Sequence, residues 1–181
     1  MANTDNPHGF RPVTCIGGMT GVMPTWQAKL KSNNVVAYGD ALYATVGYAV
    51  NSVTGDKAVL GVCAEAGLIT SSATNPDFLF YPAHDGIVFS GQTSGAMTQA
   101  KIWTLVDIEG TAGGGTDKAT RPISDQEVNE DATTNKNVYL VGLKQGGNTS
   151  LGTWTDVMFI WAKTKFQARG AMVLSTQYIG Y

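Results

Sequence analysis

Residues 35–66 read VVAYGDALYATVGYAVNSVTGDKAVLGVCAEA, a series of short apolar and β-branched runs. Gly-Asp pairs at 39–40 and 55–56 separate these runs, and such pairs supply the backbone conformations of tight turns. Residues 42–46 alternate with the two-residue period of a strand that buries one face. Residues 59–64 (VLGVCA) are apolar on both faces, which suits a strand covered on both sides. The stretch therefore predicts strands joined by turns.

The same pattern of strand and turn continues to the C-terminus, and we expect about eight to ten short strands at near-regular spacing. The clearest are residues 26–30, 78–81, 87–89, 101–108, 137–143, 155–163 and 172–174. In the first of these, Trp26, Ala28 and Leu30 are expected to point inward. Because the sequence shows no amphipathic helix beside these strands, the pattern predicts an all-β fold. Residues 22–181 would form one antiparallel β-sandwich domain.

Residues 1–21 lack a strand period and are predicted to form an extended N-terminal arm. Pro7 and Pro12 restrict the residues before them to extended backbone. Phe10 and Val13 are apolar residues that no surrounding strand explains. We therefore expect them to dock either on a partner or across the chain's own domain. Deleting the arm as far as Val13 is expected to leave the sandwich folded.

Residues 109–135 form the longest segment without a strand period, and loops of this length are usually functional or mobile. The segment begins with a glycine-rich run at 110–115. Ser124 and Glu127 have the spacing of a capping box, which predicts a single helical turn. Carboxylates in and beside this loop are expected to be ordinary solvated groups: Asp107, Glu109, Asp125, Glu127, Glu130 and Asp131.

The composition favours one domain and excludes several classes of function. The chain has 181 residues, of which 43% are hydrophobic, so it can bury one core of ordinary size. Charged residues make up 14%, well below the roughly 25% of an average domain. The net charge is −2 without a cluster of Lys and Arg, which excludes direct nucleic-acid binding. No apolar run approaches the roughly 20 residues that cross a bilayer, and no secretory signal opens the chain.

The residue types that carry catalysis are scarce. His8 and His84 are the two histidines, and no GxSxG motif supplies a nucleophile beside them. Cys15 and Cys63 lack CxxC partners, and we expect two reduced packing cysteines, although a disulfide between them is the alternative. The sequence contains neither the motif of a calcium-binding loop nor that of a P-loop. We therefore predict no catalytic residue, no cofactor and no required metal.

Three segments resemble the head decoration (cement) proteins of tailed bacteriophages. Residues 6–13 (NPHGFRPV) resemble their opening, which carries a GFRPV-like segment. Residues 82–95 (PAHDGIVFSGQTSG) are similar to a Pro-Ala turn followed by a short strand and a Gln-containing loop. Residues 155–166 (TDVMFIWAKTKF) resemble their closing strand, so the resemblance touches nearly the whole chain. The long loop at 110–135 departs from the family pattern.

The resemblance implies a jelly-roll-like sandwich, with the β-tulip of other decoration proteins as the alternative fold. It implies a structural virion protein, not an enzyme, that is made in the host cytoplasm and assembles as a homotrimer. This trimer would lie on the outer surface of the capsid and stabilise it by bridging neighbouring subunits of the major capsid protein. The residues expected to bind the capsid are Pro7, Phe10, Arg11, Pro12 and Val13, with Arg11 paired to a carboxylate of the partner.

A second class of function fits the same sequence features. A carbohydrate-binding or receptor-binding β-sandwich would also have a sparsely charged surface. Exposed aromatic residues in loops, with carboxylates along one rim, would favour this alternative over the virion protein.

Overall fold

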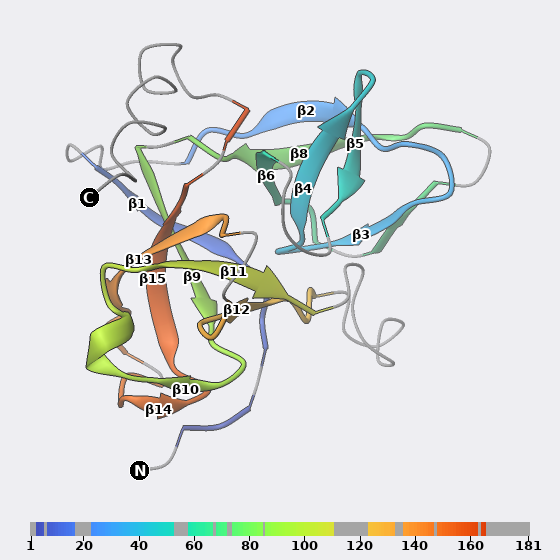
Figure 1. Cartoon of the computed structure of the whole chain (residues 1–181). Coiled ribbons are helices and arrows are strands. Elements are labelled where there is room, and N and C mark those ends of the chain that lie inside the picture. Colours follow the sequence, from blue (N-terminus) through green and yellow to red (C-terminus); the bar gives the residue numbers. More distant parts are fainter. Residues whose placement is uncertain are drawn as a thin grey trace.

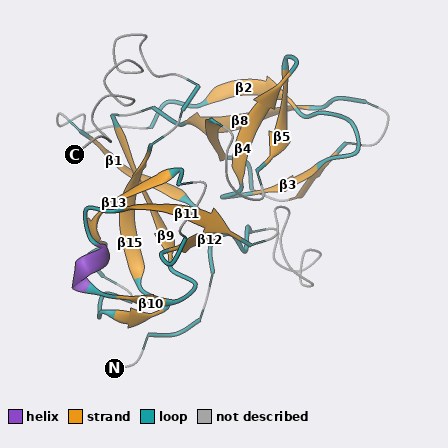
Figure 2. Ribbon diagram, viewed as in Figure 1, coloured by secondary structure: helices purple, strands orange, loops and turns teal. Residues whose placement is uncertain are grey.

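A computed structural model describes residues 3–5, 7–16, 23–52, 58–66, 68–71, 74–84, 86–110, 123–132, 136–146, 148–162 and 164–165. These residues form strands β1 to β15 and one short 3-10 helix, η1 (Gln99–Lys101). Figure 2 shows how little of the described chain is helical. The prediction of an all-β, antiparallel fold is therefore confirmed. The candidate strand at 172–174 and the glycine-rich run at 111–115 lie outside the described residues.

Two antiparallel sheets contain most of the strands. The six-stranded sheet has the order β1-β9-β15-β13-β11-β12, and the five-stranded sheet has the order β2-β8-β6-β4-β5. The strands of the first are β1 (Arg11–Cys15), β9 (Ile87–Gln92), β15 (Asp156–Trp161), β13 (Val138–Leu143), β11 (Leu105–Glu109) and β12 (Glu127–Asn129). Those of the second are β2 (Trp26–Lys29), β8 (Asp77–Pro82), β6 (Val59–Cys63), β4 (Ala41–Thr45) and β5 (Tyr48–Asn51). Two ribbons complete the fold: β3 (Val35–Ala37) with β7 (Leu68–Thr70), and β10 (Ala96–Met97) with β14 (Gly152–Thr153).

The five-stranded sheet is one continuous insertion in the six-stranded sheet. Strands β2 to β8 fall between β1 and β9 in sequence, yet β1 and β9 pair directly, with Cys15 opposite Ile87. In Figure 1 the inserted sheet lies at the upper right and the six-stranded sheet at the lower left. The junction between the two sheets is therefore built from the ends of β1, β2, β8 and β9. The jelly-roll connectivity and the β-tulip alternative both stay predictions.

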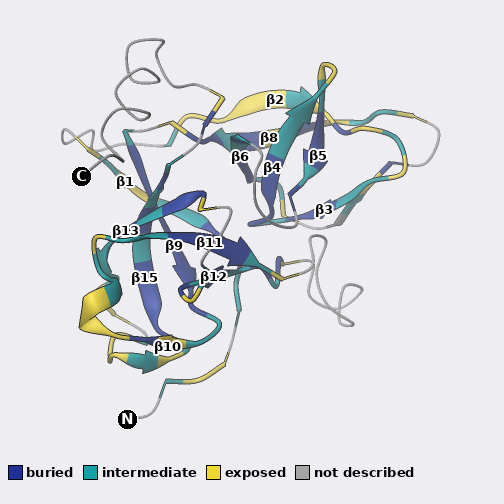
Figure 3. Cartoon of the chain, viewed as in Figure 1, coloured by how far each residue is buried: buried dark blue, intermediate teal, exposed yellow. Residues whose placement is uncertain are grey.

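Strand β6 separates two hydrophobic clusters. Val59 and Val62 belong to the larger cluster, which also contains the buried faces of β9, β13 and β15. Cys63 belongs to the smaller cluster inside the five-stranded sheet, and Leu60 packs against that cluster. The sequence prediction of a strand covered on both faces is confirmed, and Figure 3 shows both clusters as buried strand segments.

Each sheet curls until strands that are not neighbours in its order meet. In the five-stranded sheet, Leu30 at the end of β2 forms a parallel bridge with Ala49 of β5. In the six-stranded sheet, Thr93 after β9 bridges Val128 of β12 in the same way. Curling places the inward side chains of both strands on one enclosed cluster, which explains why Leu30 and Val128 are fully buried.

Residues 7–16 belong to the domain, which corrects the prediction of an arm for this part of residues 1–21. Arg11–Cys15 is strand β1, and the backbone N–H of Phe10 donates to the carbonyl of Gly39 at 2.9 Å. The Phe10 side chain is fully buried in the larger cluster. Its ring meets Phe159 and Trp161 edge-on, with centroids 5.4 and 5.5 Å apart. Of the two dispositions predicted for Phe10, packing on the chain's own domain is the one observed.

Two other local predictions are wrong. The strand predicted at 101–108 begins only at Leu105, because η1 and a turn at Trp103, with φ of 66°, precede it. The helical turn predicted at 124–127 is absent, because Glu127–Asn129 pairs with β11 instead. The hydroxyl of Ser124 does accept a hydrogen bond from the N–H of Gln126, so the local capping contact forms without a helix.

Candidate interaction surface

The five residues expected to bind a partner occupy different depths in the structure. Pro7, Arg11 and Pro12 are half-buried, Phe10 is fully buried, and Val13 is 42% exposed. The guanidinium carbon of Arg11 lies 5.5 Å from the ring centroid of Tyr38, a cation–π arrangement. The prediction that Phe10 presents its side chain to a partner is therefore wrong, because the core encloses it. Val13 alone among the five has an exposed side chain.

Polar contacts hold the residues before Phe10 on the domain. The side-chain amide of Asn3 donates to the carbonyls of Ser150 and Thr153, at 2.8 and 2.9 Å. The carbonyl of Thr4 accepts hydrogen bonds from the side-chain amides of Asn148 and Gln92, at 2.8 and 3.0 Å. Hydrogen bonds thus hold Asn3 and Thr4 against the loop between β13 and β15 and against the end of β9.

His8 completes this attachment through Asp156 at the start of β15. The His8 Nε2 and Asp156 Oδ1 atoms are 3.4 Å apart, and both side chains are largely buried. Burial alone would raise the pKa of Asp156. The hydrogen bond and charge of His8, together with the N–H of Asn148, outweigh burial and hold that pKa below its ordinary value. The attachment is therefore partly electrostatic.

Strand β1 lies at the edge of the six-stranded sheet. It pairs with β9 on one side, and no other described strand pairs with its second side. The register shifts between Pro12 and Thr14, so Val13 forms a bulge in which its side chain is exposed. Open strand edges with exposed apolar side chains are surfaces on which another chain can add. We call residues 11–14 the β1 edge.

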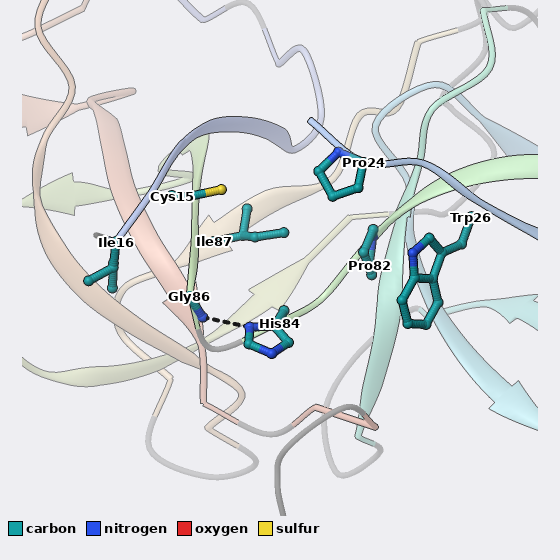
Figure 4. A pocket seen from close by; sticks show the side chains of 8 residues that line it. All are labelled: Cys15, Ile16, Pro24, Trp26, Pro82, His84, Gly86 and Ile87. Carbon is teal, nitrogen blue, oxygen red and sulfur yellow. Dashed lines mark hydrogen bonds between the residues drawn. The ribbon is translucent and has the colours of Figure 1, made fainter. Parts of the chain in front are cut away.

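An apolar groove of about 270 Å³ opens at the end of the β1 edge, where the two sheets meet. Figure 4 shows its lining, which comes from the ends of β1, β2, β8 and β9 and the turns beside them: Cys15, Ile16, Pro24, Trp26, Pro82, His84, Gly86 and Ile87. The N–H of Gly86 donates to His84 Nδ1 at 3.0 Å, which fixes the imidazole in the turn. We call this feature the junction groove.

Two large side chains at the junction groove are exposed. Ile16 is 62% exposed and Trp26 is 49% exposed, although the Trp26 ring meets Phe80 edge-on at 6.4 Å. Trp26 was expected to point inward with Ala28 and Leu30. It does share their face, but it opens β2 and therefore lies beyond the end of the cluster that encloses Leu30. Exposed apolar side chains around an apolar groove are typical of contact surfaces.

Sequence reasoning missed the junction groove because its lining comes from four separate places in the chain. Two signals were nevertheless present. Trp26 is the first residue of its strand, so it lies at a sheet end, where the core cannot cover it fully. Pro82 closes β8 and is followed by a turn, which predicts a corner at the same end of the sheet.

The acidic residues near β12 are less exposed than predicted. Glu130 is 3% exposed, and one of its carboxylate oxygens accepts a hydrogen bond from the N–H of Gly95 at 3.2 Å. Glu127 is half-buried, and burial, followed by the charges of Asp5 and Glu109, raises its pKa to about 7. Asp107 in β11 is 5% exposed. The prediction of ordinary solvated groups is therefore wrong for Glu130, Glu127 and Asp107. It holds for Asp131, which is exposed and pairs with Lys101 at 2.6 Å.

The described residues offer few groups for chemistry. Within them, no three His, Cys, Asp or Glu side chains lie close enough together to hold a metal ion. Cys15 and Cys63 are free thiols that pack against different hydrophobic clusters. Burial raises the pKa of the Cys63 thiol to about 12, so it stays protonated at neutral pH. Among the same residues, no helix is long and apolar enough to cross a membrane.

Comparisons with protein families, curated proteins and solved structures found no match to this chain. The function must therefore be inferred from the residues and their arrangement. They combine an open strand edge, an apolar groove and a sparsely charged composition, which suits binding to another protein.

Proposed function

We propose that the protein is a structural component of a bacteriophage virion. It binds the outer surface of the capsid, as a homotrimer, and stabilises the shell by bridging neighbouring subunits of the major capsid protein. The observation that carries this proposal is the position of β1. The decoration-protein-like segment at 6–13 ends in β1, which is an edge strand of the described sheet, with Val13 exposed on it. The last three residues of the motif thus lie on a surface that can bind another chain.

The buried position of Phe10 changes the role expected for the N-terminal segment. In this proposal Phe10 fixes β1 in the domain, and Val13 makes the contact with the capsid. The direction and shape of the segment are set by Pro7, Arg11 and Pro12. Pro12 pairs opposite Phe89 in the sheet, and the Arg11 guanidinium lies over the Tyr38 ring. A rigid edge loses less conformational entropy on binding than a free arm would.

A binding role without chemistry also fits the low charge and the scarcity of catalytic groups in the described residues. A decoration protein must resist the outward strain of packaged DNA through many contacts. A homotrimer presents three copies of the same edge, so each further contact forms at a high effective concentration. Weak individual contacts can then add up to firm attachment.

The β1 edge is tested by the substitution Val13→Asp. A carboxylate at this exposed position leaves the folded domain intact but places an unpaired charge in the contact with the capsid. We expect about tenfold weaker co-sedimentation with undecorated capsid shells, equivalent to about 1.4 kcal/mol. Val46→Asp is the matched control, because Val46 is 94% exposed on the β4–β5 hairpin, away from the edge. If both variants bind shells as tightly as the unaltered protein, the β1 edge is not the contact.

A second candidate function, glycan binding, has one specific observation in its favour. Trp103 is 62% exposed in a turn with φ of 66°, and its ring centroid lies 6.2 Å from that of Tyr139. Exposed non-glycine residues with positive φ often mark functional sites. An exposed Trp ring beside the half-buried ring of Tyr139 offers an amphipathic platform. Asparagine tolerates this backbone conformation, so Trp103→Asn removes the ring without adding strain. Glycan-array binding that this variant abolishes would favour the second function.

A further inference from the structure

Arg11 is the first residue of the β1 edge, and its neighbours hold it in place. The N–H of Phe10 donates to the carbonyl of Gly39 at 2.9 Å, which brings the start of β1 against the turn that contains Tyr38. The guanidinium carbon of Arg11 lies 5.5 Å from the ring centroid of Tyr38. Arg11 and Tyr38 are both half-buried, so both side chains are held on the domain and still reach its surface.

Tyr38 is fixed by two further parts of the chain. Its carbonyl accepts a hydrogen bond from the N–H of Ser124 at 2.8 Å, and it forms a parallel bridge with Ile123. Burial, followed by the charge of Tyr38 and a hydrogen bond with it, raises the pKa of Tyr81 in β8. A hydrogen bond that raises the pKa of a phenol is donated by its neutral form, so the Tyr81 hydroxyl donates to the Tyr38 oxygen. The Tyr38 hydroxyl therefore keeps its own proton for another acceptor.

The Arg11 guanidinium has no anionic partner in the described part of the chain. No ion pair joins it to a described carboxylate, and its buried Nε atom finds no hydrogen-bond acceptor there. The contact with the face of the Tyr38 ring stabilises the cation without supplying an acceptor oxygen. A guanidinium carries five N–H donors in a rigid fork that matches the two oxygens of a carboxylate. These donors are therefore available to a partner that supplies such a group.

We propose that Arg11 and the Tyr38 hydroxyl bind a carboxylate of the capsid protein, supplied by an Asp or Glu side chain of the segment that docks on the β1 edge. The guanidinium donates to both carboxylate oxygens, and the Tyr38 hydroxyl donates to one of them. Val13, on the same strand, supplies the apolar contact, so the docking segment carries its carboxylate close to an apolar side chain. This inference rests on the proposed function and adds the chemistry of the partner at that surface.

Co-sedimentation of substituted proteins with undecorated capsid shells tests the proposal. Arg11→Gln should bind about tenfold to a hundredfold more weakly, the usual effect of losing charge-assisted hydrogen bonds. Arg11→Lys keeps the charge but not the fork, so it should recover only part of this loss. The matched control is Lys29→Gln, which removes the same charge from an exposed side chain of β2 that pairs with Asp77 at 3.3 Å. This control should bind like the unaltered protein.

Tyr38→Phe keeps the test independent of changes in β1. The substitution removes the hydroxyl and leaves the aromatic ring beside Arg11, so the domain should fold as before. We expect about threefold weaker binding to the shells, the usual effect of losing one hydrogen bond. Thermal melts of all variants verify that they are folded. Unchanged binding of a folded Tyr38→Phe variant would overturn the role given to the hydroxyl.

Chemical blocking of the shells identifies the source of the carboxylate. Shells whose surface carboxylates are amidated with a carbodiimide and glycinamide should bind the unaltered protein only as well as untreated shells bind Arg11→Gln. Amidation should cost Arg11→Gln nothing further, because the two changes remove the same interaction. Equal losses for both proteins on amidated shells would overturn the inference. Equal binding of both to untreated shells would overturn it and leave the proposed function standing, whereas unaltered protein that does not bind shells contradicts both.

Discussion

Phe10 connects the N-terminal segment to the core through one aromatic ring. The ring lies against Phe159 and Trp161, and Gly91 of β9 makes room for it. A Cβ atom at Gly91 would lie 2.8 Å from the Phe10 ring, so a larger residue there would displace the ring. Phe10, which belongs to the segment that resembles a family motif, therefore also holds the N-terminal segment on the core.

Replacing Phe10 by Ala should lower the free energy of unfolding by about 3 to 5 kcal/mol, the usual cost of removing a buried aromatic ring. Urea denaturation followed by tryptophan fluorescence measures the change. Val13→Ala, on an exposed side chain three residues away, should change the same quantity by less than about 0.5 kcal/mol. A loss below about 1 kcal/mol for Phe10→Ala would show that the ring is not enclosed as described.

The charge of Glu127 is expected to affect stability near neutral pH. Its pKa is about 7 in the folded protein against an ordinary value of 4.5. Burial is the largest cause, and the charges of Asp5, Glu109 and Asp125 add to it. Within the described residues, no hydrogen-bond donor reaches Glu127 Oε1, so ionisation leaves that oxygen unsatisfied.

Because the folded pKa of Glu127 is raised, its contribution to stability is fully present below pH 4.5 and is lost as pH rises through about 7. Glu127→Gln keeps the side chain uncharged at every pH, so the variant should not lose this stability as pH rises. We expect the variant to be about 1 to 2 kcal/mol more stable than the unaltered protein at pH 8, after allowance for solvent screening of a half-buried group. Thermal denaturation at pH 5 and pH 8 tests this, and Asp131→Asn is the exposed control. Equal pH dependence of Glu127→Gln and the unaltered protein would contradict the buried position of this carboxylate.

At the scale of single elements, β1 is where sequence reasoning was weakest. Its five residues contain Pro12 and a bulge at Val13, so the two-residue period that identifies a strand is broken. Its partner β9 lies more than seventy residues away in sequence, beyond the inserted five-stranded sheet. Local pattern could therefore not predict that β1 belongs to a sheet.

The structure reverses the expectation that the chain without residues 1–13 stays folded. That deletion removes Phe10 and most of β1, so it should destabilise the domain severely. Deleting residues 1–5 removes the contacts of Asn3 and Thr4 but keeps β1, and it should leave the domain folded. Thermal melts of both shortened chains measure the difference. Equal melting temperatures for the two would contradict the assignment of β1 to the sheet.

Sequence periodicity was sufficient where a strand lies in the middle of a sheet. The apolar run at 59–64 predicted that β6 is covered on both faces. The apolar segment at 155–163 predicted β15, in which Val157, Phe159 and Trp161 are buried. The capping-box spacing at Ser124 failed, because pairing of β12 with β11 outweighs a local preference for a helical turn.

At the scale of the whole molecule, the junction groove depends on topology that the sequence does not display. Cys15, Trp26, Pro82 and Ile87 meet only because β2 to β8 are inserted between two paired strands. Each local pattern was readable, but the pairing of β1 with β9 decides which sheet ends come together. Sequence periodicity can identify single strands, but it cannot predict which distant strands pair.

The open β1 edge also motivates a prediction of oligomeric state. We expect a homotrimer in solution, because a sparsely charged protein with an open strand edge and exposed apolar residues can bury more surface by association. Sedimentation equilibrium at micromolar concentration gives the mass without a shape assumption. A mass of three chains supports the prediction, whereas a single species at 19.1 kDa contradicts it.

We propose that this protein binds and stabilises a phage capsid. Purified protein should be titrated onto undecorated, DNA-filled shells, and both co-sedimentation and the temperature of DNA release should be measured. The proposal predicts saturable binding to the outer surface and a higher release temperature that follows the bound amount. Protein that stays in the supernatant at all concentrations, with an unchanged release temperature, would contradict it.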